Sequence, residues 1–265
     1  MRQGTGSVEA PDGTVLGYQV TGRGPPLVLV HGAASDARQW AKVVPLMAPD
    51  FTVMVMDRRG RGSSGPIRPD HSLDVEYDDI AAVARAAGGP VHLVGHSSGA
   101  RFALHAALRV PELAGLVLYE PPPPETFPPG VLESLARLEA SGDREGILEV
   151  FLLDVAGNDE EALAFIRGRP IWPIMVDNAL TLPAELRAAR QYRFDPGSLA
   201  TLSVPATCLV GEHSGPEVRR AADEVARTLA TAEVRVLAGQ GHGAMFSAPD
   251  LFAGEVRRSC RLRST

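Results

Sequence analysis

The segment GHSSG, residues 95–99, places Ser97 between two glycines, a spacing that can present a hydroxyl as a nucleophile. It directly follows the apolar run 91–94 and directly precedes a helical pattern. A sharp strand-to-helix turn requires small flanking residues and pushes the serine hydroxyl out at the edge of a sheet. The helix that follows aims its positive N-terminus at the same place. The motif therefore predicts that Ser97 attacks a carbonyl carbon.

A serine hydroxyl needs a base to accept its proton, and the base needs a carboxylate to orient it. Of the seven histidines, His242 fits best, because it lies in a glycine-rich loop after the last apolar run. Such a loop leaves an imidazole mobile enough to reach Ser97. His31 and His96 are held by the motifs around them. We therefore expect His242 to be the general base.

A second polar loop, HGAAS at residues 31–35, follows the apolar run 27–30. Small residues there allow backbone N–H groups to point into a site. The N–H groups of Ala33 and Ser98 are expected to form an oxyanion hole, which stabilises the negative charge that develops on a substrate carbonyl in the transition state.

Alternating strands and helices must position these motifs. Expected strands, read from apolar runs, cover residues 15–20, 27–30, 52–56, 91–94, 116–119, 207–210 and 234–237, and expected helices cover 37–47, 73–87, 98–109, 217–230 and 250–261. Continuous apolar runs are typical of parallel strands that are covered on both faces. The turn at 11–13 predicts a hairpin with the strand 15–20. The alternation predicts an α/β fold with an open sheet.

One segment, residues 121–204, interrupts the alternation. It opens with four prolines and contains helical patterns at 131–140, 144–155, 160–167 and 184–192, without a convincing strand. Insertions at the carboxyl ends of strands lie where binding sites form in such sheets. We expect a core of residues 1–120 and 205–265, with 121–204 as a helical lid.

Composition limits the classes of function. The 265 residues are 45% hydrophobic and 22% charged, with a net charge of −6, so no basic surface suggests nucleic-acid binding. No run approaches the ~18 apolar residues of a membrane span, and no leader sequence is visible. Cys208 and Cys260 lack the spacing of a zinc site. We expect a reduced cytoplasmic protein, without metal or organic cofactor, that acts on a small molecule; its oligomeric state stays open.

Together these motifs resemble the α/β-hydrolase superfamily. HGAAS, DRRGRGSS at residues 57–64, GHSSG and GQGH at residues 239–242 follow the third, fourth, fifth and last strands in the family's order. The resemblance covers nearly the whole chain. It implies a mostly parallel eight-stranded sheet with the lid inserted after the sixth strand, and a triad in the order serine, acid, histidine. It also implies Ser97 as nucleophile, His242 as base and a structural role for Asp57.

The acid departs from the commonest pattern of the family. Most relatives carry an aspartate after the seventh strand, where this chain has Ser214 in the segment GEHS. Some carry the acid after the sixth strand instead, and Glu120 stands at that position. The resemblance thus implies that Glu120 orients His242 and stabilises its imidazolium form. A residue near Ser214, such as Glu212, is the alternative.

A glutamate after the sixth strand, the elbow SSGA and a G-x-x-S segment after the seventh strand resemble the fungal zearalenone lactonases, which open a macrocyclic ester. By that resemblance Trp172, in the segment RPIWP, is expected to contact substrate. A place in the core of the lid fits Trp172 equally well. The oxyanion loop differs, since HGA is the general form of the superfamily.

The sequence thus predicts a serine hydrolase that cleaves an ester or lactone through an acyl-enzyme with a Ser97–His242–Glu120 triad. A catalytically weak ligand-binding receptor or regulatory module stays open, as do a carbon–carbon bond hydrolase and a cofactor-free perhydrolase. Epoxide hydrolases and haloalkane dehalogenases carry aspartate at the nucleophile position, so Ser97 argues against both.

Overall fold

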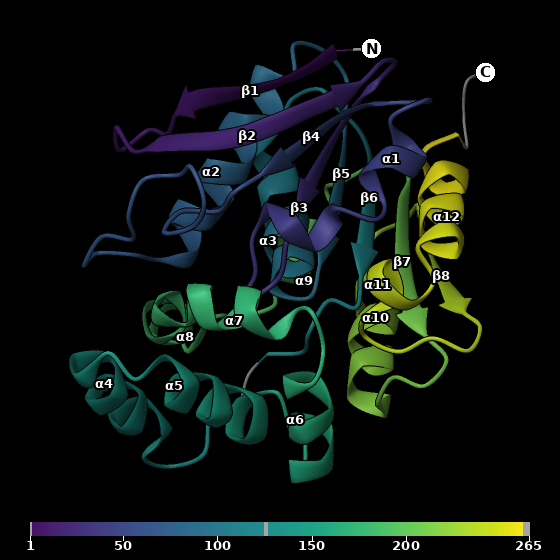
Figure 1. Ribbon diagram of the computed structural model, residues 1–265. Coiled ribbons are helices and arrows are strands. Elements are labelled where there is room, and N and C mark those ends of the chain that lie inside the picture. Colours follow the sequence, from purple (N-terminus) through teal and green to yellow (C-terminus); the bar gives the residue numbers. More distant parts are fainter. Residues whose placement is uncertain (1, 125–126, 262–265) are drawn as a thin grey trace.

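The computed structural model describes residues 2–124 and 127–261, and an eight-stranded sheet organises them (Figure 1). The strands are β1 Arg2–Glu9, β2 Val15–Gly22, β3 Pro26–Val30, β4 Thr52–Met56, β5 Val91–His96, β6 Leu113–Tyr119, β7 Ala206–Gly211 and β8 Ala232–Leu237. Their order is β1-β2-β4-β3-β5-β6-β7-β8, and every pair from β4 to β8 is parallel. The predicted hairpin and the mostly parallel eight-stranded sheet are confirmed.

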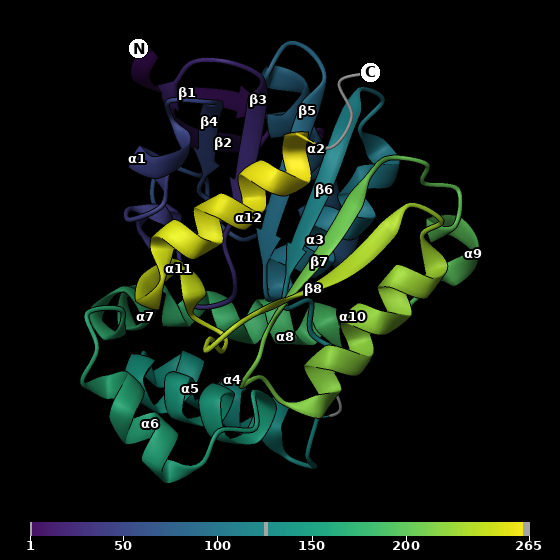
Figure 2. The same ribbon diagram turned by 90° about the vertical axis from the view of Figure 1, so that its right-hand side faces the viewer.

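Helices cover both faces of the sheet (Figure 2). They are α1 Val44–Met47, α2 Leu73–Ala86, α3 Ser98–Ala106, α10 Pro216–Thr228, α11 Ala244–Ser247 and α12 Pro249–Arg261. Alternate residues of β3 show the two-sided burial: Val28 and Val30 join a core with α2, α3 and α10, whereas Leu27 and Leu29 join a second core with α1 and α12. The strands read as continuous apolar runs for this reason.

Helices and turns connect β6 to β7 among the described residues. They are α4 Val131–Ser141, α5 Arg144–Val150, η3 Phe151–Val155, α6 Glu160–Arg167, α7 Trp172–Asn178, η4 Ala179–Thr181, α8 Leu182–Ala189 and α9 Pro196–Leu199. We call residues 121–204 the helical insertion. Most of its helices lie beyond the carboxyl ends of the parallel strands (Figure 1). It has its own apolar core, to which Leu135, Ile147 and Leu182 belong, and that core also includes Ala34 of the loop after β3.

The helical insertion also carries the excess of acidic residues. Residues 121–204 contain thirteen aspartates and glutamates, seven arginines and no lysine. The rest of the chain is balanced, so the net charge of −6 belongs to the insertion.

Two expected helices differ from the structure. The single helix expected over 37–47 is wrong, because a 3₁₀ turn at Ala37–Trp40 is followed by the separate helix α1. Pro45 explains the break, since proline lacks the N–H that a continuous helix needs and fits only in a first turn. The helix expected over 144–155 becomes a π-helical turn at Phe151–Val155. Across the part of the chain that the structure describes, no helix is long and apolar enough to cross a membrane.

Candidate active site

Ser97 occupies a strained turn between β5 and α3. Its φ of 54° and ψ of −125° lie outside the ordinary regions for a residue with a side chain. The glycines on either side permit the turn: a Cβ on Gly95 would overlap the backbone of Gly99, and a Cβ on Gly99 would overlap the carbonyl oxygen of His31. The Ser97 N–H donates to the carbonyl of Tyr119 at 2.9 Å. Ser97 therefore stands at the carboxyl end of β5, beside the end of β6.

Glu120 and His242 meet across the same edge of the sheet. The distance between Nδ1 of His242 and Oε2 of Glu120 is 2.6 Å. The other carboxylate oxygen, Oε1, accepts the N–H of Gly211 at 2.8 Å and the hydroxyl of Ser214. Glu120 has a φ of 50° and is 1% exposed. Ser214, which stands where most relatives carry the triad aspartate, thus donates a hydrogen bond to the carboxylate of Glu120.

These contacts control the ionisation of Glu120. Burial opposes its charge, but the hydrogen bond and charge of His242, with the donors Ser214 and Gly211, outweigh burial and lower the pKa of Glu120. At neutral pH the carboxylate is ionised, and it accepts a hydrogen bond from the protonated Nδ1 of His242. In its neutral form, a histidine that carries its one proton on Nδ1 has an unprotonated Nε2, which is the form that a general base requires.

The loop after β8 brings the ring of His242 against that of His96, without a hydrogen bond between His242 and Ser97 among the described residues. The ring of His96, the residue before Ser97, lies 4.5 Å from the ring of His242 between centroids. The side chain of His242 is 56% exposed, and its Nε2 has no hydrogen-bond partner among the described residues. Ser97, Glu120 and His242 therefore gather at the ends of β5, β6 and β8, although they are far apart in sequence.

The loop after β3 lies against the strand-to-helix turn that carries Ser97. A Cβ on Gly32 would lie 3.2 Å from both Nδ1 of His96 and Cβ of Ser97. Ala34 adopts a φ of 47° and is fully buried. Within residues 2–124 and 127–261, the N–H groups of Ala33 and Ser98 have no hydrogen-bond partner. Both donors therefore remain available for an oxyanion.

His31 and Arg58 hold this loop from behind. Nε2 of His31 accepts the N–H of Arg58 at 3.1 Å, and Nη1 of Arg58 donates to the carbonyl of Gly32 at 3.2 Å. Burial keeps the pKa of His31 well below its usual value, so the ring is neutral and can accept that bond. Asp57 accepts the N–H groups of Ala37 and Ser63, each at 3.0 Å. These hydrogen bonds support the loops after β3 and β4, and none of them involves a residue of the candidate triad.

A buried ion cluster joins the helical insertion to the core. Glu185 of α8 contacts Arg58 at 3.1 Å and also pairs with Arg61, while Glu76 of α2 pairs with Arg58 at 2.7 Å. All four side chains are at most 5% exposed. The sequence analysis missed Glu76 and Glu185, since each reads as one polar residue in an amphipathic helix. Their partners lie in the DRRGRG segment, whose dense arginines require buried carboxylates.

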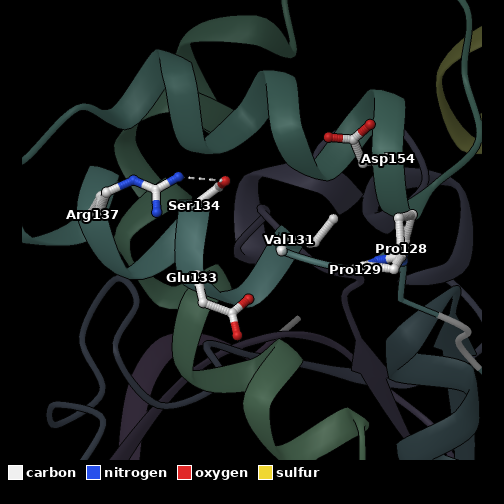
Figure 3. Close-up of a pocket in the computed structure, with 8 residues that line it drawn as sticks. Pro128, Pro129, Val131, Glu133, Ser134, Arg137 and Asp154 are labelled. Atoms are coloured by element: carbon white, nitrogen blue, oxygen red, sulfur yellow. Dashed lines mark hydrogen bonds between the residues drawn. The ribbon is translucent and has the colours of Figure 1, made fainter.

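Trp172 begins α7 and is half-buried. It packs on the core of the helical insertion, as Ala33 does, and the guanidinium of Arg167 lies 5.4 Å from its ring. Figure 3 shows a surface hollow elsewhere in the insertion, between residues 128–137 and Asp154. None of the three candidate triad residues lines it. Substrate contact by Trp172 stays a prediction.

Known proteins resemble the chain over most of its length. It is 31% identical over 252 residues to a pimeloyl-[acyl-carrier protein] methyl ester esterase of Stenotrophomonas maltophilia, covering 90% of this chain and 94% of that protein. An α/β hydrolase from Sphaerobacter thermophilus superposes with a TM-score of 0.86 at 33% identity, over 96% of this chain and 99% of that one. An enol-lactonase from Burkholderia xenovorans shares the fold, with a TM-score of 0.78 at 18% identity over 96% and 99% of the two chains.

The relatives support hydrolase activity, and the resemblance to zearalenone lactonases stays a prediction. The family described as the alpha/beta hydrolase family matches residues 27–255, which span the motifs from the loop after β3 to α12. Because that family matches most of this chain, the chain belongs to the α/β-hydrolase family.

Proposed function

We propose that the protein is a serine hydrolase that cleaves ester or lactone bonds. The observation that carries the proposal is the 2.6 Å contact between His242 Nδ1 and Glu120 Oε2, next to the strained Ser97. A buried carboxylate behind an imidazole, with a serine in a nucleophile elbow, is the arrangement that activates a hydroxyl for acyl transfer.

Ser97 Oγ attacks the substrate carbonyl carbon as His242 Nε2 takes the hydroxyl proton. The N–H groups of Ala33 and Ser98 stabilise the oxyanion. When the tetrahedral intermediate collapses, His242 gives its proton to the leaving alkoxide, and the acyl group stays on Ser97. Water, activated by the same imidazole, then attacks the acyl-enzyme and releases the acid. Glu120 keeps Nδ1 protonated throughout and stabilises the imidazolium.

The helical insertion acts in this proposal as a lid that shapes the substrate site. Ala34 of the oxyanion loop belongs to the insertion's core, and Glu185 fixes α8 to the core arginines. Trp172 is proposed to line the substrate side of this lid. The relative from Stenotrophomonas maltophilia is named as a methyl ester esterase, so short alkyl esters are the first substrates to test, followed by lactones.

The test is steady-state turnover of p-nitrophenyl acetate, p-nitrophenyl butyrate and a series of lactones. Ser97→Ala should lower kcat by a factor on the order of 10⁴ to 10⁶. His213→Ala is the matched control, since His213 is an exposed histidine in the loop after β7. Full turnover in Ser97→Ala would refute the proposal. Covalent labelling of Ser97 without turnover of any ester or lactone would favour a ligand-binding receptor.

A further inference from the structure

Two buried aromatic side chains hold the backbone on either side of His242. The hydroxyl of Tyr119 donates to the carbonyl of Gly241 and accepts the N–H of Ala244 at 3.1 Å. Nε2 of His96 lies 2.9 Å from the carbonyl of His242 and, facing an acceptor, must be the donor. The loop that sequence alone suggests to be mobile is therefore held at three points, residues 241, 242 and 244.

The two side chains occupy equivalent places in the sheet. His96 directly precedes Ser97 at the end of β5, and Tyr119 directly precedes Glu120 at the end of β6. Their rings stack, with centroids 5.2 Å apart and planes at 29°. Each strand therefore ends in a pair of residues, one facing the substrate site and one holding the loop of the base.

Both donors keep their protons at neutral pH. Burial, with the charge of nearby His242, keeps the pKa of His96 well below its usual value, so its single proton sits on Nε2, opposite the carbonyl. Nδ1 of His96 has no partner in the described part of the chain. Burial and the charge of Glu120 raise the pKa of Tyr119, so its hydroxyl remains protonated.

We infer that His96 and Tyr119 are positioning residues that fix His242 through its backbone. The inference rests on the proposed function, in which His242 must reach both Glu120 and Ser97. More than half of the His242 side chain is exposed, and Glu120 is its only side-chain hydrogen-bond partner among the described residues. A single contact lets an imidazole pivot, whereas a fixed backbone leaves its Nε2 directed at one place.

The test removes one of these two hydrogen-bond donors at a time. Tyr119→Phe and His96→Phe should each lower kcat for p-nitrophenyl butyrate by about 10- to 100-fold, because a misplacement of about 1 Å can cost as much as 10²-fold. KM should stay within about twofold, since neither side chain contacts substrate in the proposed site. His96→Gln retains a terminal N–H donor and should recover part of kcat. Tyr18→Phe, which alters a half-buried tyrosine on β2, is the matched control and should turn over normally.

A second readout does not depend on activity. Amide hydrogen exchange at Ala244 should accelerate by roughly fivefold or more in Tyr119→Phe, since its acceptor is lost, while thermal unfolding reports the fold. Unchanged exchange together with normal kcat would overturn the inference, as would a rise in KM at constant kcat. Faster exchange in a protein whose parent turns over no ester or lactone would support the positioning role and refute the proposed function.

Discussion

The buried contact between Glu185 and two arginines predicts a large loss of stability in Glu185→Gln. This change keeps the size of the side chain and removes its charge. Arg58 retains the carboxylate of Glu76, whereas Arg61 retains two neutral acceptors, the carbonyl of Arg59 at 3.1 Å and the new amide oxygen at position 185. Arg61 then holds a charge with no paired carboxylate among the described residues, at 0% side-chain exposure.

Removing one partner of a buried ion pair typically costs about 3–5 kcal/mol. For a chain of this size, each kcal/mol lowers the melting temperature by about 2–4 °C, so Glu185→Gln should melt roughly 6–20 °C lower. Glu139→Gln is the matched control in the same insertion. Glu139 pairs with Arg187 at 2.9 Å, but both side chains are at least 36% exposed, so the expected cost is about 0–1 kcal/mol.

Thermal and urea unfolding, followed by circular dichroism, measure both variants. A double variant, Arg61→Leu with Glu185→Leu, should recover most of the stability, because apolar replacement of a whole buried pair is often neutral. If Glu185→Gln unfolds at the same temperature as Glu139→Gln, then the cluster does not fix the helical insertion to the core.

Two further predictions concern the acid and the pH. Glu120→Gln should lower kcat by about 10²-fold or more, because the imidazole loses the charge that holds its tautomer, whereas Ser214→Ala should change kcat by less than about tenfold. Steady-state ester turnover measures both, and the reverse ranking would move the acid to the loop after β7. Burial lowers the pKa of four histidines, that of His105 to about 4. The unfolded chain therefore binds protons that the folded chain excludes, so stability is complete above about pH 6.5 and falls as the pH decreases below it. Melting temperatures between pH 7.5 and 5 test this, and His105→Gln should flatten the slope; a constant melting temperature would contradict it.

The sequence allowed the sheet to be predicted, and pointed to the residues of the candidate site, because these signals are local. Ser97, Glu120 and the loop of His242 each follow an apolar strand directly, and parallel strands place such positions at one edge. The helix expected over 37–47 was wrong for a local reason too, because the segment contains Pro45, which carries no N–H.

The supporting contacts could not be predicted, since their partners are distant in sequence. Arg61 and Glu185 are separated by 124 residues, and Tyr119 and Gly241 by 122. The sequence gives the chemical type of each partner, but it does not show which residue of the helical insertion lies against which residue of the core. Tyr119 reads as one more apolar residue of a buried strand, and only the path of the loop after β8 reveals the role of its hydroxyl.

The uneven placement of acidic residues gives the molecule an electric dipole. A neutral core with an insertion that holds the whole net charge of −6 directs a negative potential toward molecules that approach from the insertion side. This potential would repel an approaching ester that carries a carboxylate and would attract one that carries an ammonium group. Added salt shortens the reach of the field to about 8 Å at physiological ionic strength, so the difference between the two association rates should shrink as salt rises.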